Sequence, residues 1–395
     1  MSRLQIYDPR ERLMVQLADL ALAPVGWTRG RAAAADAPVR RVLLLRLERI
    51  GDLLMVLDAI RDARAAWPQA EIDLAVGSWN VALARLIPEI TEIVTIDAPW
   101  LTRETSGGDS WPAMRTRALG WRGHAYDLVI NFEPDIRSNL LAWWSGAPRR
   151  VGYWTGGGGA LLTRALEYDP LRHVSTNARR LVAEASTHAV PPEQPHVASG
   201  QRLVPPADAI ATARALLANA QRPLIGLHAS GGRESKQWHF DRFATVGRTL
   251  TESLGGTIVL TGARSDRALV DTVKRGLGSA RTVDAVGAVE LPALAALLAE
   301  LDVLITGDTG PMHLAAAMDT PVVALFGPSQ PWRYGPLASR QRILRVDLPC
   351  SPCGQVRLPP ERCRGHVPDC MDAIQVDVVV KAARDLLADA SSTTA

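Results

Sequence analysis

The chain has 395 residues, 47% of them hydrophobic, which is enough for two domains that each bury a core. Its formal net charge is only +3, and it has no long basic run, which argues against a nucleic-acid groove. No apolar stretch reaches the roughly 18 residues needed to span a bilayer, and the first residues lack the pattern of a secretory signal. These features predict a cytoplasmic enzyme.

Residues 1–40 differ from the rest of the chain and form an N-terminal extension. Between Arg10 and Leu22, apolar residues recur at helical spacing among Arg and Asp, which predicts an amphipathic helix. A linker is predicted at residues 30–36. The helix either packs on the main body or a second subunit, or lies in a membrane interface. Its apolar residues are Leu13, Met14, Leu17, Leu20 and Leu22.

Residues 41–200 alternate between short apolar runs and helical patterns. A helix at 53–66 follows the first run, and the Gly156–Gly159 segment predicts a flexible loop. Such alternation is typical of a parallel sheet covered by helices on both faces. The predicted strands are 42–45, 72–76, 93–96, 128–131 and 151–153.

A Pro-rich polar stretch from Pro191 to Pro206 predicts a connection between domains, after which the alternation restarts. Residues 201–375 therefore form a second, similar unit, and the segment 376–395 adds a last helix over about 376–387. The predicted fold class is α/β, with two doubly wound units in tandem. Strands are predicted at 224–228, 257–260, 303–306 and 322–326, and helices at 240–253, 265–277 and 291–300.

The segment from Gly307 to Leu314 is the most informative in the chain. It follows a predicted buried strand, and Pro311 suits the first turn of a helix over 311–318. Free amides and the positive end of the helix dipole make such a turn a site for a phosphate. Asp308 and His313 add polar groups at the carboxyl end of a strand, where open α/β sheets bind ligands. This segment predicts a nucleotide-diphosphate site.

Gly51 and Asp52 follow the first strand and open the first helix. Asp52 is explained equally well as a helix cap or as a carboxylate that takes a proton from an attacking hydroxyl. The segment lacks the three-glycine dinucleotide fingerprint, which argues against an NAD-dependent dehydrogenase.

The segment from His228 to Trp238 leaves the first strand of the second unit. Gly231 permits close approach of the backbone to a ligand, and Lys236, one of only three lysines, suits a phosphate. The alternative is a polar surface loop in which Trp238 anchors the next helix. One strand further along, Asp266 either holds a ribose hydroxyl or caps its own helix.

All four cysteines fall in one loop segment, 349–371, with the spacing C-x2-C-x9-C-x6-C. In a reducing compartment disulfides are not expected. Four thiolates that begin with C-x2-C suit a structural zinc or iron ion. The alternative is a set of small buried residues or a disulfide. The predicted ligands are Cys350, Cys353, Cys363 and Cys370.

From about Arg41 to the C-terminal helix, the chain resembles glycosyltransferase family nine, the lipopolysaccharide heptosyltransferases. The resemblance rests on Arg49–Asp52 after the first strand, on His228–Trp238 with its Ser-Lys-x-Trp end, and on Asp308–His313. The stretch Pro349–Cys353 is similar to the cysteine-bearing segment of some members. Each piece is modest alone, but four in the right order and spacing are specific.

This resemblance implies a GT-B architecture, in which two Rossmann-like domains face each other across a cleft. Residues 41–200 would bind the acceptor, and residues 201–375 the nucleotide-sugar, usually ADP-L-glycero-D-manno-heptose. Transfer would invert the anomeric carbon without a catalytic metal or other cofactor. Asp52 would be the general base, with Gly51 beside it. The residues expected to meet the donor are Ser230, Gly231, Lys236, Asp266, Asp308, Thr309, Gly310 and His313.

The chain also departs from the family pattern. Residues 1–40 precede the usual start and are expected to add a membrane, partner or oligomer contact. A membrane contact would place the cytoplasmic enzyme at the inner face of the cytoplasmic membrane. The acceptor region has no dense basic patch, although Arg103, Arg137, Arg149 and Arg150 are available for acidic sugars. Autotransporter heptosyltransferases also carry a metal-binding cysteine set. A protein or small-molecule acceptor, or a non-catalytic nucleotide-sugar or metal-binding role, are therefore the alternatives to a lipopolysaccharide glycan.

Overall fold

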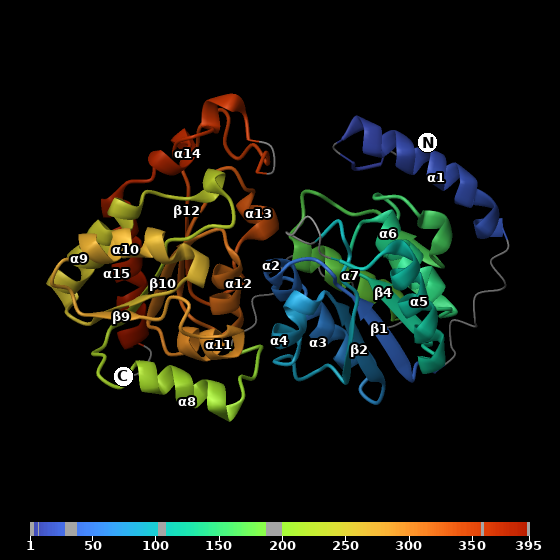
Figure 1. The fold of residues 1–395 in the computed structure, drawn as a ribbon, viewed down its shortest axis with the longest axis horizontal. Helices are drawn as coiled ribbons and strands as arrows, with labels where there is room; N and C mark the ends of the chain where they lie inside the picture. The colour runs from blue at the N-terminus through green and yellow to red at the C-terminus, as the bar shows by residue number, and fades with distance from the viewer. Residues whose placement is uncertain are drawn as a thin grey trace. The chain divides into compact units, whose positions relative to one another are not determined.

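The structure is a computed structural model that describes residues 4–6, 8–27, 38–101, 108–186, 200–356 and 359–392. Its contacts divide the chain into two compact units, Met1–His196 and Val197–Ala395 (Figure 1). The linker predicted at residues 30–36 and most of the Pro-rich stretch lie outside the described residues.

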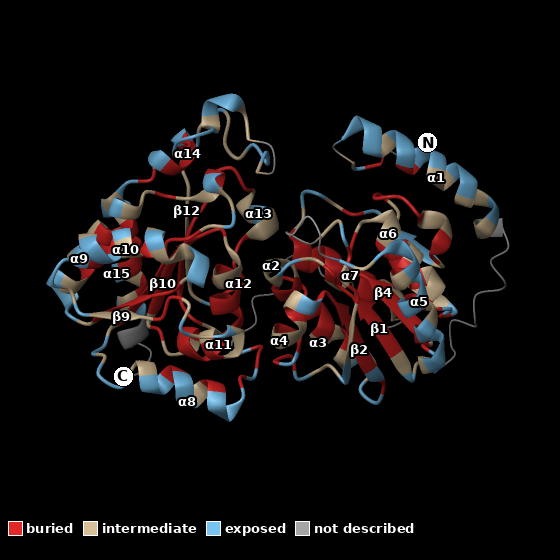
Figure 2. Ribbon diagram, viewed as in Figure 1, coloured by how far each residue is buried: buried red, intermediate tan, exposed pale blue. Residues whose placement is uncertain are grey.

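The first unit is built on a six-stranded parallel sheet in the order β3-β2-β1-β4-β5-β6. The two central strands are apolar and buried, as expected for a sheet covered on both faces, and Figure 2 draws them in red. The strands are β1 (Arg41–Leu45), β2 (Glu71–Val76), β3 (Glu92–Thr95), β4 (Leu128–Asn131), β5 (Arg149–Tyr153) and β6 (Arg164–Leu166).

Helices cover both faces of this sheet (Figure 1). Leu43 and Leu45 of β1 pack with Met114 and Leu141 from two neighbouring helices, α5 and α6, on one face. Helices α3 and α7 pack together on the other. The helices are α1 (Pro9–Trp27), α2 (Ile50–Leu54), α3 (Leu57–Ala66), η1 (Ser78–Asn80), α4 (Val81–Ala84), α5 (Trp111–Gly120), η2 (Trp121–His124), α6 (Ile136–Trp144), η3 (Gly159–Leu161) and α7 (Val174–Ala185).

The second unit repeats the same plan, with the strand order β9-β8-β7-β10-β11-β12. Ile225 and Leu227 of β7 pack with Phe243 and Val270 in one hydrophobic core cluster. Its strands are β7 (Leu224–His228), β8 (Thr257–Leu260), β9 (Thr282–Asp284), β10 (Val303–Gly307), β11 (Val322–Leu325) and β12 (Gln341–Leu344).

Helices α9, α10 and α15 cover one face of the second sheet, and α8 and α11 pack together elsewhere on it. The helices are α8 (Ala207–Leu216), η4 (Glu234–Lys236), α9 (Phe240–Leu254), η5 (Arg264–Asp266), α10 (Arg267–Gly276), α11 (Leu291–Ala299), α12 (Gly310–Ala317), α13 (Pro331–Tyr334), η6 (Glu361–Cys363), α14 (Asp369–Asp372) and α15 (Val376–Ser392).

The predicted doubly wound α/β fold is confirmed, but three strands were not predicted. These are β6, β9 and β12, each at the edge of its sheet and only three or four residues long. Edge strands are half-exposed, so they lack the continuous apolar run that marks a buried strand. The helix predicted at 53–66 is in fact two helices, α2 and α3.

Helix α1 differs most from expectation. The helix packs on the main body, as one of the expectations had it, but the predicted apolar face, with Leu13, Leu17 and Leu20, points outward. The opposite side contacts η3 instead, and Val15, which is 8% exposed, is buried there. No helix in the described part of the chain is both long enough and apolar enough to cross a membrane.

Candidate active site

In each unit, the carboxyl ends of the first and fourth strands lie side by side and carry polar residues. Leu45 of β1 is paired with Asn131 of β4, and His228 of β7 is paired with Thr306 of β10. Between these strands the order of the sheet reverses, which is where open α/β sheets bind ligands. Both predicted motifs therefore leave their sheets at this kind of position.

In the first unit, Asp52 lies in the first turn of α2. Its Oδ2 accepts a hydrogen bond from the backbone N–H of Arg49 at 3.2 Å, and Arg49 is the N-cap. Asp52 is thus the third residue of the helix and reaches back to the cap, rather than being the cap itself. Its side chain is 31% exposed, so the carboxylate remains accessible. Gly51 precedes it in the same turn.

Arg46 lies directly beneath this turn and is almost completely buried. Its Nη1 is 2.9 Å from Glu48 Oε2, and its Nη2 is 3.6 Å from Asp52 Oδ1. Burial lowers the pKa of Arg46, but the nearby carboxylates of Glu48 and Asp52 outweigh it and hold the pKa above its usual value. A fixed positive charge therefore lies beside the Asp52 carboxylate.

Glu133 holds the same turn from the end of β4. Its Oε1 accepts hydrogen bonds from the backbone N–H groups of Leu47 and, at 3.1 Å, Glu48. Glu133 is 2% exposed, and this burial, followed by repulsion from Glu48, raises its pKa to about 8. The raised pKa favours the neutral acid, and the residue positions the backbone that leads into α2.

In the second unit, Lys236 and Asp308 form an ion pair across the ends of β7 and β10. Lys236 Nζ donates to Asp308 Oδ2 at 2.6 Å, and the two side chains are 22% and 7% exposed. The pair brings together two of the predicted motifs, which are 72 residues apart in sequence. Gly307 is needed here, since a Cβ at this position would lie 3.2 Å from the backbone oxygen of Lys236.

Helix α12 begins directly after Asp308. Thr309 is its N-cap, but the Thr309 side chain makes no capping bond and lies 3.2 Å from the Thr306 hydroxyl instead. Gly310 and a proline form the first turn, as the sequence predicted, and His313 is buried one turn further along. The cation of Lys236 and the positive end of the α12 dipole thus share one strand end, a combination that suits a phosphate.

A hydrogen-bonded group that sequence reasoning did not identify lies beside this pair. His228 Nδ1 is 3.0 Å from the Thr261 hydroxyl, and its Nε2 is 3.0 Å from the Ser230 hydroxyl. Burial lowers the pKa of His228 to about 4, so the ring is neutral and orients Ser230 by hydrogen bonding. The available signal was a polar residue at the end of a predicted apolar strand, as for Arg46 and Glu133.

Two other predicted residues have local contacts. Asp266 accepts a hydrogen bond from the N–H of Ala263 at 2.8 Å, as a helix-capping residue does, and it is close enough to His228 to act on its charge. The backbone oxygen of Gly231 accepts a hydrogen bond from Gln237 at 3.2 Å. Trp238 packs edge-on against Phe243 of the following helix, with ring centroids 5.1 Å apart, as the alternative explanation predicted, and its Nε1 donates to Ile374 O at 3.1 Å.

All four cysteines are free and form no disulfide. Burial raises the pKa of the Cys370 thiol to about 11, and the other three cysteines, Cys350, Cys353 and Cys363, raise it further. Four neighbouring thiols fit a structural zinc or iron ion by donor type. Among the described residues, however, only Asp73, Glu92 and His124 bring three ligand atoms within 4.8 Å of one another.

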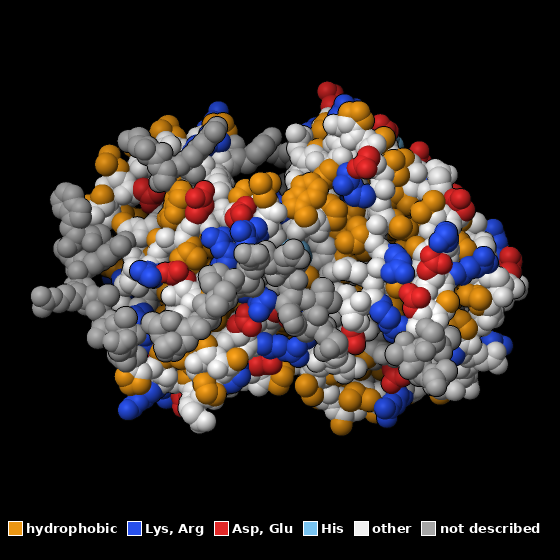
Figure 3. Space-filling view, turned by 180° about the vertical axis from the view of Figure 1, so that it is seen from behind, with side chains coloured by type: hydrophobic (Ala, Val, Ile, Leu, Met, Phe, Trp, Pro, Cys, Tyr) orange, Lys and Arg blue, Asp and Glu red, His pale blue; other side chains and the backbone are white. Residues whose placement is uncertain are grey.

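Of the arginines predicted to meet acidic sugars, Arg103 lies outside the described residues. Arg137 is bound to Asp135, with Nε donating to Oδ1 at 2.9 Å, and Arg150 Nε donates to Leu161 O at 2.7 Å. Arg149 is half-buried on β5. On the face drawn in Figure 3, basic and acidic side chains are interspersed.

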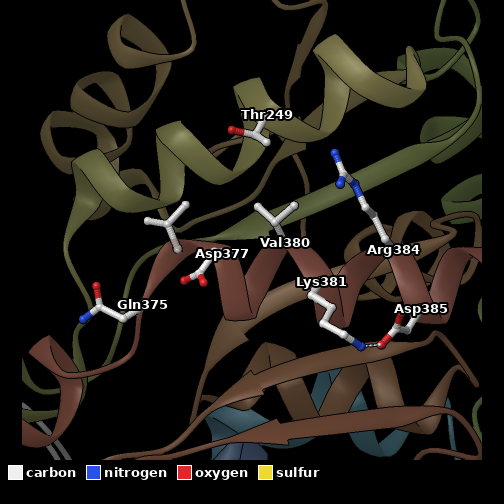
Figure 4. Close-up of a pocket in the computed structure, with 8 residues that line it drawn as sticks. Thr249, Gln375, Asp377, Val380, Lys381, Arg384 and Asp385 are labelled. Atoms are coloured by element: carbon white, nitrogen blue, oxygen red, sulfur yellow. Dashed lines mark hydrogen bonds and ion pairs between the residues drawn. The ribbon is translucent and has the colours of Figure 1, made fainter.

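A surface pocket of the second unit lies between α9 and α15 (Figure 4). It is lined by residues such as Thr249, Val380 and Lys381, and Lys381 pairs with Asp385 at 2.7 Å. None of the predicted site residues lines it. The strand ends described above have the chemistry of a nucleotide site, whereas this groove between two helices does not.

The comparisons with known proteins point to one family. The model of glycosyltransferase family 9 (heptosyltransferase) matches residues 116–360. Lipopolysaccharide heptosyltransferase 2 of Salmonella typhimurium is 27% identical over 324 residues, which cover 78% of this chain and 88% of that protein.

Two solved structures confirm the fold. E. coli ADP-heptose lps heptosyltransferase II has a TM-score of 0.73 at 21% identity, covering 89% of this chain and 99% of that chain. The iron-containing dodecameric glycosyltransferase TibC from enterotoxigenic E. coli has a TM-score of 0.51 at 14% identity, covering 89% and 77%. These likenesses confirm the GT-B fold class. Since the family model covers more than half of the sequence, this protein belongs to glycosyltransferase family 9 and is a glycosyltransferase.

Proposed function

We propose that this protein transfers a heptosyl group from ADP-heptose to a sugar hydroxyl of a lipopolysaccharide core. The proposal follows from family membership, and relatives and neighbours named for this reaction support it. The observation that carries the donor chemistry is the Lys236–Asp308 pair at the N-terminus of α12. In this proposal the unit of residues 201–375 binds the nucleotide-sugar, and that of residues 41–200 binds the acceptor.

The donor diphosphate is held by one point charge and one helix end. Lys236 supplies the charge, and Asp308 fixes its ammonium group at 2.6 Å. The hydroxyls of Ser230 and Thr309 and the first amides of α12, from Gly310 onward, supply hydrogen bonds. Asp266 holds the ribose, and His313 orders the start of α12. Preorganised donors of this kind are worth about 3 kcal/mol of barrier each.

Asp52 is the general base in this proposal. The carboxylate is 31% exposed, Arg46 Nε donates to the Asp52 backbone oxygen at 3.1 Å, and Glu133 holds the segment that precedes the helix. Asp52 takes the proton of the acceptor hydroxyl as the oxygen attacks the anomeric carbon. The bond from that carbon to the diphosphate oxygen breaks on the opposite face, so the configuration inverts. The electron pair leaves with ADP, whose growing charge Lys236 and α12 stabilise, and no catalytic metal or other cofactor takes part.

The cysteine cluster would hold a structural iron or zinc ion. The support is the proximity of the four thiols and the likeness to a neighbour whose name describes it as iron-containing. A bound ion would fix the loop of residues 349–371 against the body of the unit. Cys370 is already close to that body, because a Cβ at Gly327 would lie 3.0 Å from its sulfur.

The acceptor is lipid-linked in this proposal, and the protein works at the inner face of the cytoplasmic membrane. A second candidate acceptor is a protein. The observation that favours it is the set of four free cysteines, because it is the feature in which the chain resembles autotransporter heptosyltransferases.

A nucleotide-release assay tests the function. The purified protein is incubated with ADP-heptose alone, with a delipidated heptose-containing core oligosaccharide, and with a candidate protein acceptor. We expect ADP release that depends on the oligosaccharide, together with an oligosaccharide product one heptose heavier by mass spectrometry. If ADP were released with the protein acceptor but not with the oligosaccharide, the acceptor would be a protein and not a lipopolysaccharide core. Absence of release with every acceptor, despite donor binding, would contradict transfer itself.

A further inference from the structure

The outward face of α1 carries four large apolar side chains in water. Leu13, Met14, Leu17 and Leu20 are 58%, 69%, 60% and 73% exposed. They make up four of the ten large hydrophobic residues that are exposed in the described part of the chain. Scattered exposed leucines need no explanation, but a stripe of them on one helix marks an interaction surface.

The helix cannot hide this stripe by rolling over, because its other side is fixed. Asp19 Oδ1 accepts a hydrogen bond from the N–H of Gly158 at 2.6 Å, and Val15 lies against Gly157, where an added Cβ would be 2.3 Å from its side chain. Gly157 and Gly158 have φ values of +90° and +72°, which glycine adopts without strain. Helix α1 therefore packs against the Gly156–Gly159 loop.

The charge on the outward face is positive. Arg10, Leu13, Leu17 and Leu20 are spaced by three and four residues and lie along one side of the helix. Three acidic residues lie beside this face: Asp8 Oδ1 accepts the backbone N–H of Arg10 at 2.7 Å, Asp19 is bound to Gly158, and Glu11, which is 51% exposed, is 3.5 Å from Arg137 of α6. The stripe therefore presents apolar side chains beside the exposed Arg10.

We propose that this stripe docks the protein onto an anionic lipid bilayer, with α1 lying in the interface. A basic apolar face suits the boundary between headgroups and acyl chains, and anionic lipids attract the arginine. A second copy of the same stripe would instead bring two Arg10 side chains near each other. The proposal depends on the proposed function only for the presence of a lipid-linked acceptor in that membrane.

Vesicle sedimentation tests the surface directly. The full chain is mixed with vesicles of phosphatidylethanolamine and phosphatidylglycerol, and separately with pure phosphatidylcholine. We expect the apparent partition coefficient to be at least tenfold higher on the anionic vesicles. The triple variant L13Q/L17Q/L20Q should lose tenfold or more of this binding, and Arg10→Glu should lose a smaller part that high salt also removes.

Leu171→Gln is the matched control, since Leu171 is 77% exposed in the same unit but not on α1. It should bind vesicles as the wild type does. Because all three substituted leucines are exposed, the triple variant should keep the wild-type thermal unfolding temperature. A triple variant that unfolds earlier is replaced by the single variant L17Q, which should still lose at least threefold of the binding.

Unchanged vesicle binding in the triple variant would overturn the proposal. So would a wild-type dimer in analytical ultracentrifugation that the triple variant dissociates, together with no binding to anionic vesicles. The transfer assay separates this from the proposed function. The triple variant should transfer heptose normally to a water-soluble oligosaccharide and lose activity only on acceptor embedded in vesicles. If the wild type bound vesicles but transferred heptose to neither acceptor, the proposed function would be contradicted and the proposed membrane surface supported.

Discussion

The two units share one strand order, and in both a carboxyl group holds the segment after the first strand. The accessible charge at that position is negative in the first unit and positive in the second. In each, a carboxyl group after the fourth strand holds the segment after the first. In the first unit, Glu133 accepts hydrogen bonds from the backbone before Asp52, and an acidic group remains accessible. In the second, Asp308 holds Lys236, and a cation remains beside a helix N-terminus.

This comparison shows that the fold sets where the polar groups lie, at the ends of the first and fourth strands, and that the side chains there determine the chemistry. The first unit offers a carboxylate, which suits removal of a proton. The second offers positive charge, which suits a diphosphate. Variants that exchange or remove these groups should therefore affect turnover in one unit and donor binding in the other.

The largest effect is expected from Asp52→Asn. The amide keeps the shape of the side chain but cannot take a proton, so kcat should fall by about 10²–10⁴-fold. The dissociation constant for ADP-heptose, measured by calorimetry, should remain within about twofold. Asp62→Asn, which breaks the ion pair of Asp62 on α3 with Arg179 on α7, is the control and should turn over normally. If Asp52→Asn weakened donor binding as much as it lowered kcat, the assignment of proton removal to the first unit and donor binding to the second would be contradicted.

The next effect is expected from Lys236→Met. Loss of the ammonium group should weaken ADP binding by about 100-fold, equivalent to the roughly 3 kcal/mol of one preorganised donor. It also leaves Asp308 buried without its partner, so the free energy of unfolding should fall. Adding Asp308→Asn should restore stability but not affinity. Lys381→Met, which breaks an exposed pair with Asp385, should bind ADP as the wild type does. Unaltered ADP affinity in Lys236→Met would place the diphosphate elsewhere.

A smaller effect concerns Glu133 and pH. Burial raises its pKa from 4.5 to about 8, so between these values the folded chain holds a proton that the unfolded chain releases. The stability of the wild type should therefore fall as pH rises through this window, by about 1.4 kcal/mol per pH unit at most. Glu133→Gln cannot ionise and keeps an oxygen for the Leu47 and Glu48 amides. In urea unfolding, the variant should gain stability relative to the wild type between pH 6 and 8.5.

The control for this pH effect is Glu71→Gln, which removes an exposed partner of Arg41 and should leave the pH dependence unchanged. If the free energies of unfolding of Glu133→Gln and the wild type differed by the same amount at pH 6 and at pH 8.5, Glu133 would be ionised in the folded protein. The turn that bears Asp52 would then be held by charge rather than by a neutral acid.

The smallest effect on transfer is expected from the cysteines. Protein purified without oxygen should carry about one iron or zinc ion per chain by elemental analysis, and Cys353→Ser with Cys363→Ser should remove it. Turnover should change by no more than a few-fold, because the ion has no part in the transfer step. Ser351→Ala, between two of the cysteines, should keep the metal. Metal-free wild-type protein with full activity would show the cluster to be thiols alone.

Much of the fold was predictable because buried parallel strands are continuous apolar runs. The same reason explains the failures, since β6, β9 and β12 are edge strands with half-exposed residues. At the site, Asp52, Lys236 and Asp308 were found from local motifs. Local sequence could not show that Lys236 and Asp308 pair, because that contact joins residues far apart in the chain.

The supporting residues were missed for a related reason. Glu133, Arg46 and His228 act through contacts with distant backbone or side chains, and their burial changes their pKa. A polar residue at the end of an apolar strand was the only local signal. The outward face of α1 was also unpredictable, because the helical pattern shows an apolar face but not which way it points.

The anomeric configuration of the product tests the central claim most directly. NMR of the oligosaccharide formed from ADP-heptose should show the new glycosidic bond with the configuration opposite to that of the donor. Inversion is the outcome of a single displacement in which Asp52 takes the acceptor proton while Lys236 and α12 stabilise the departing ADP. A product with the donor's own configuration would contradict that mechanism.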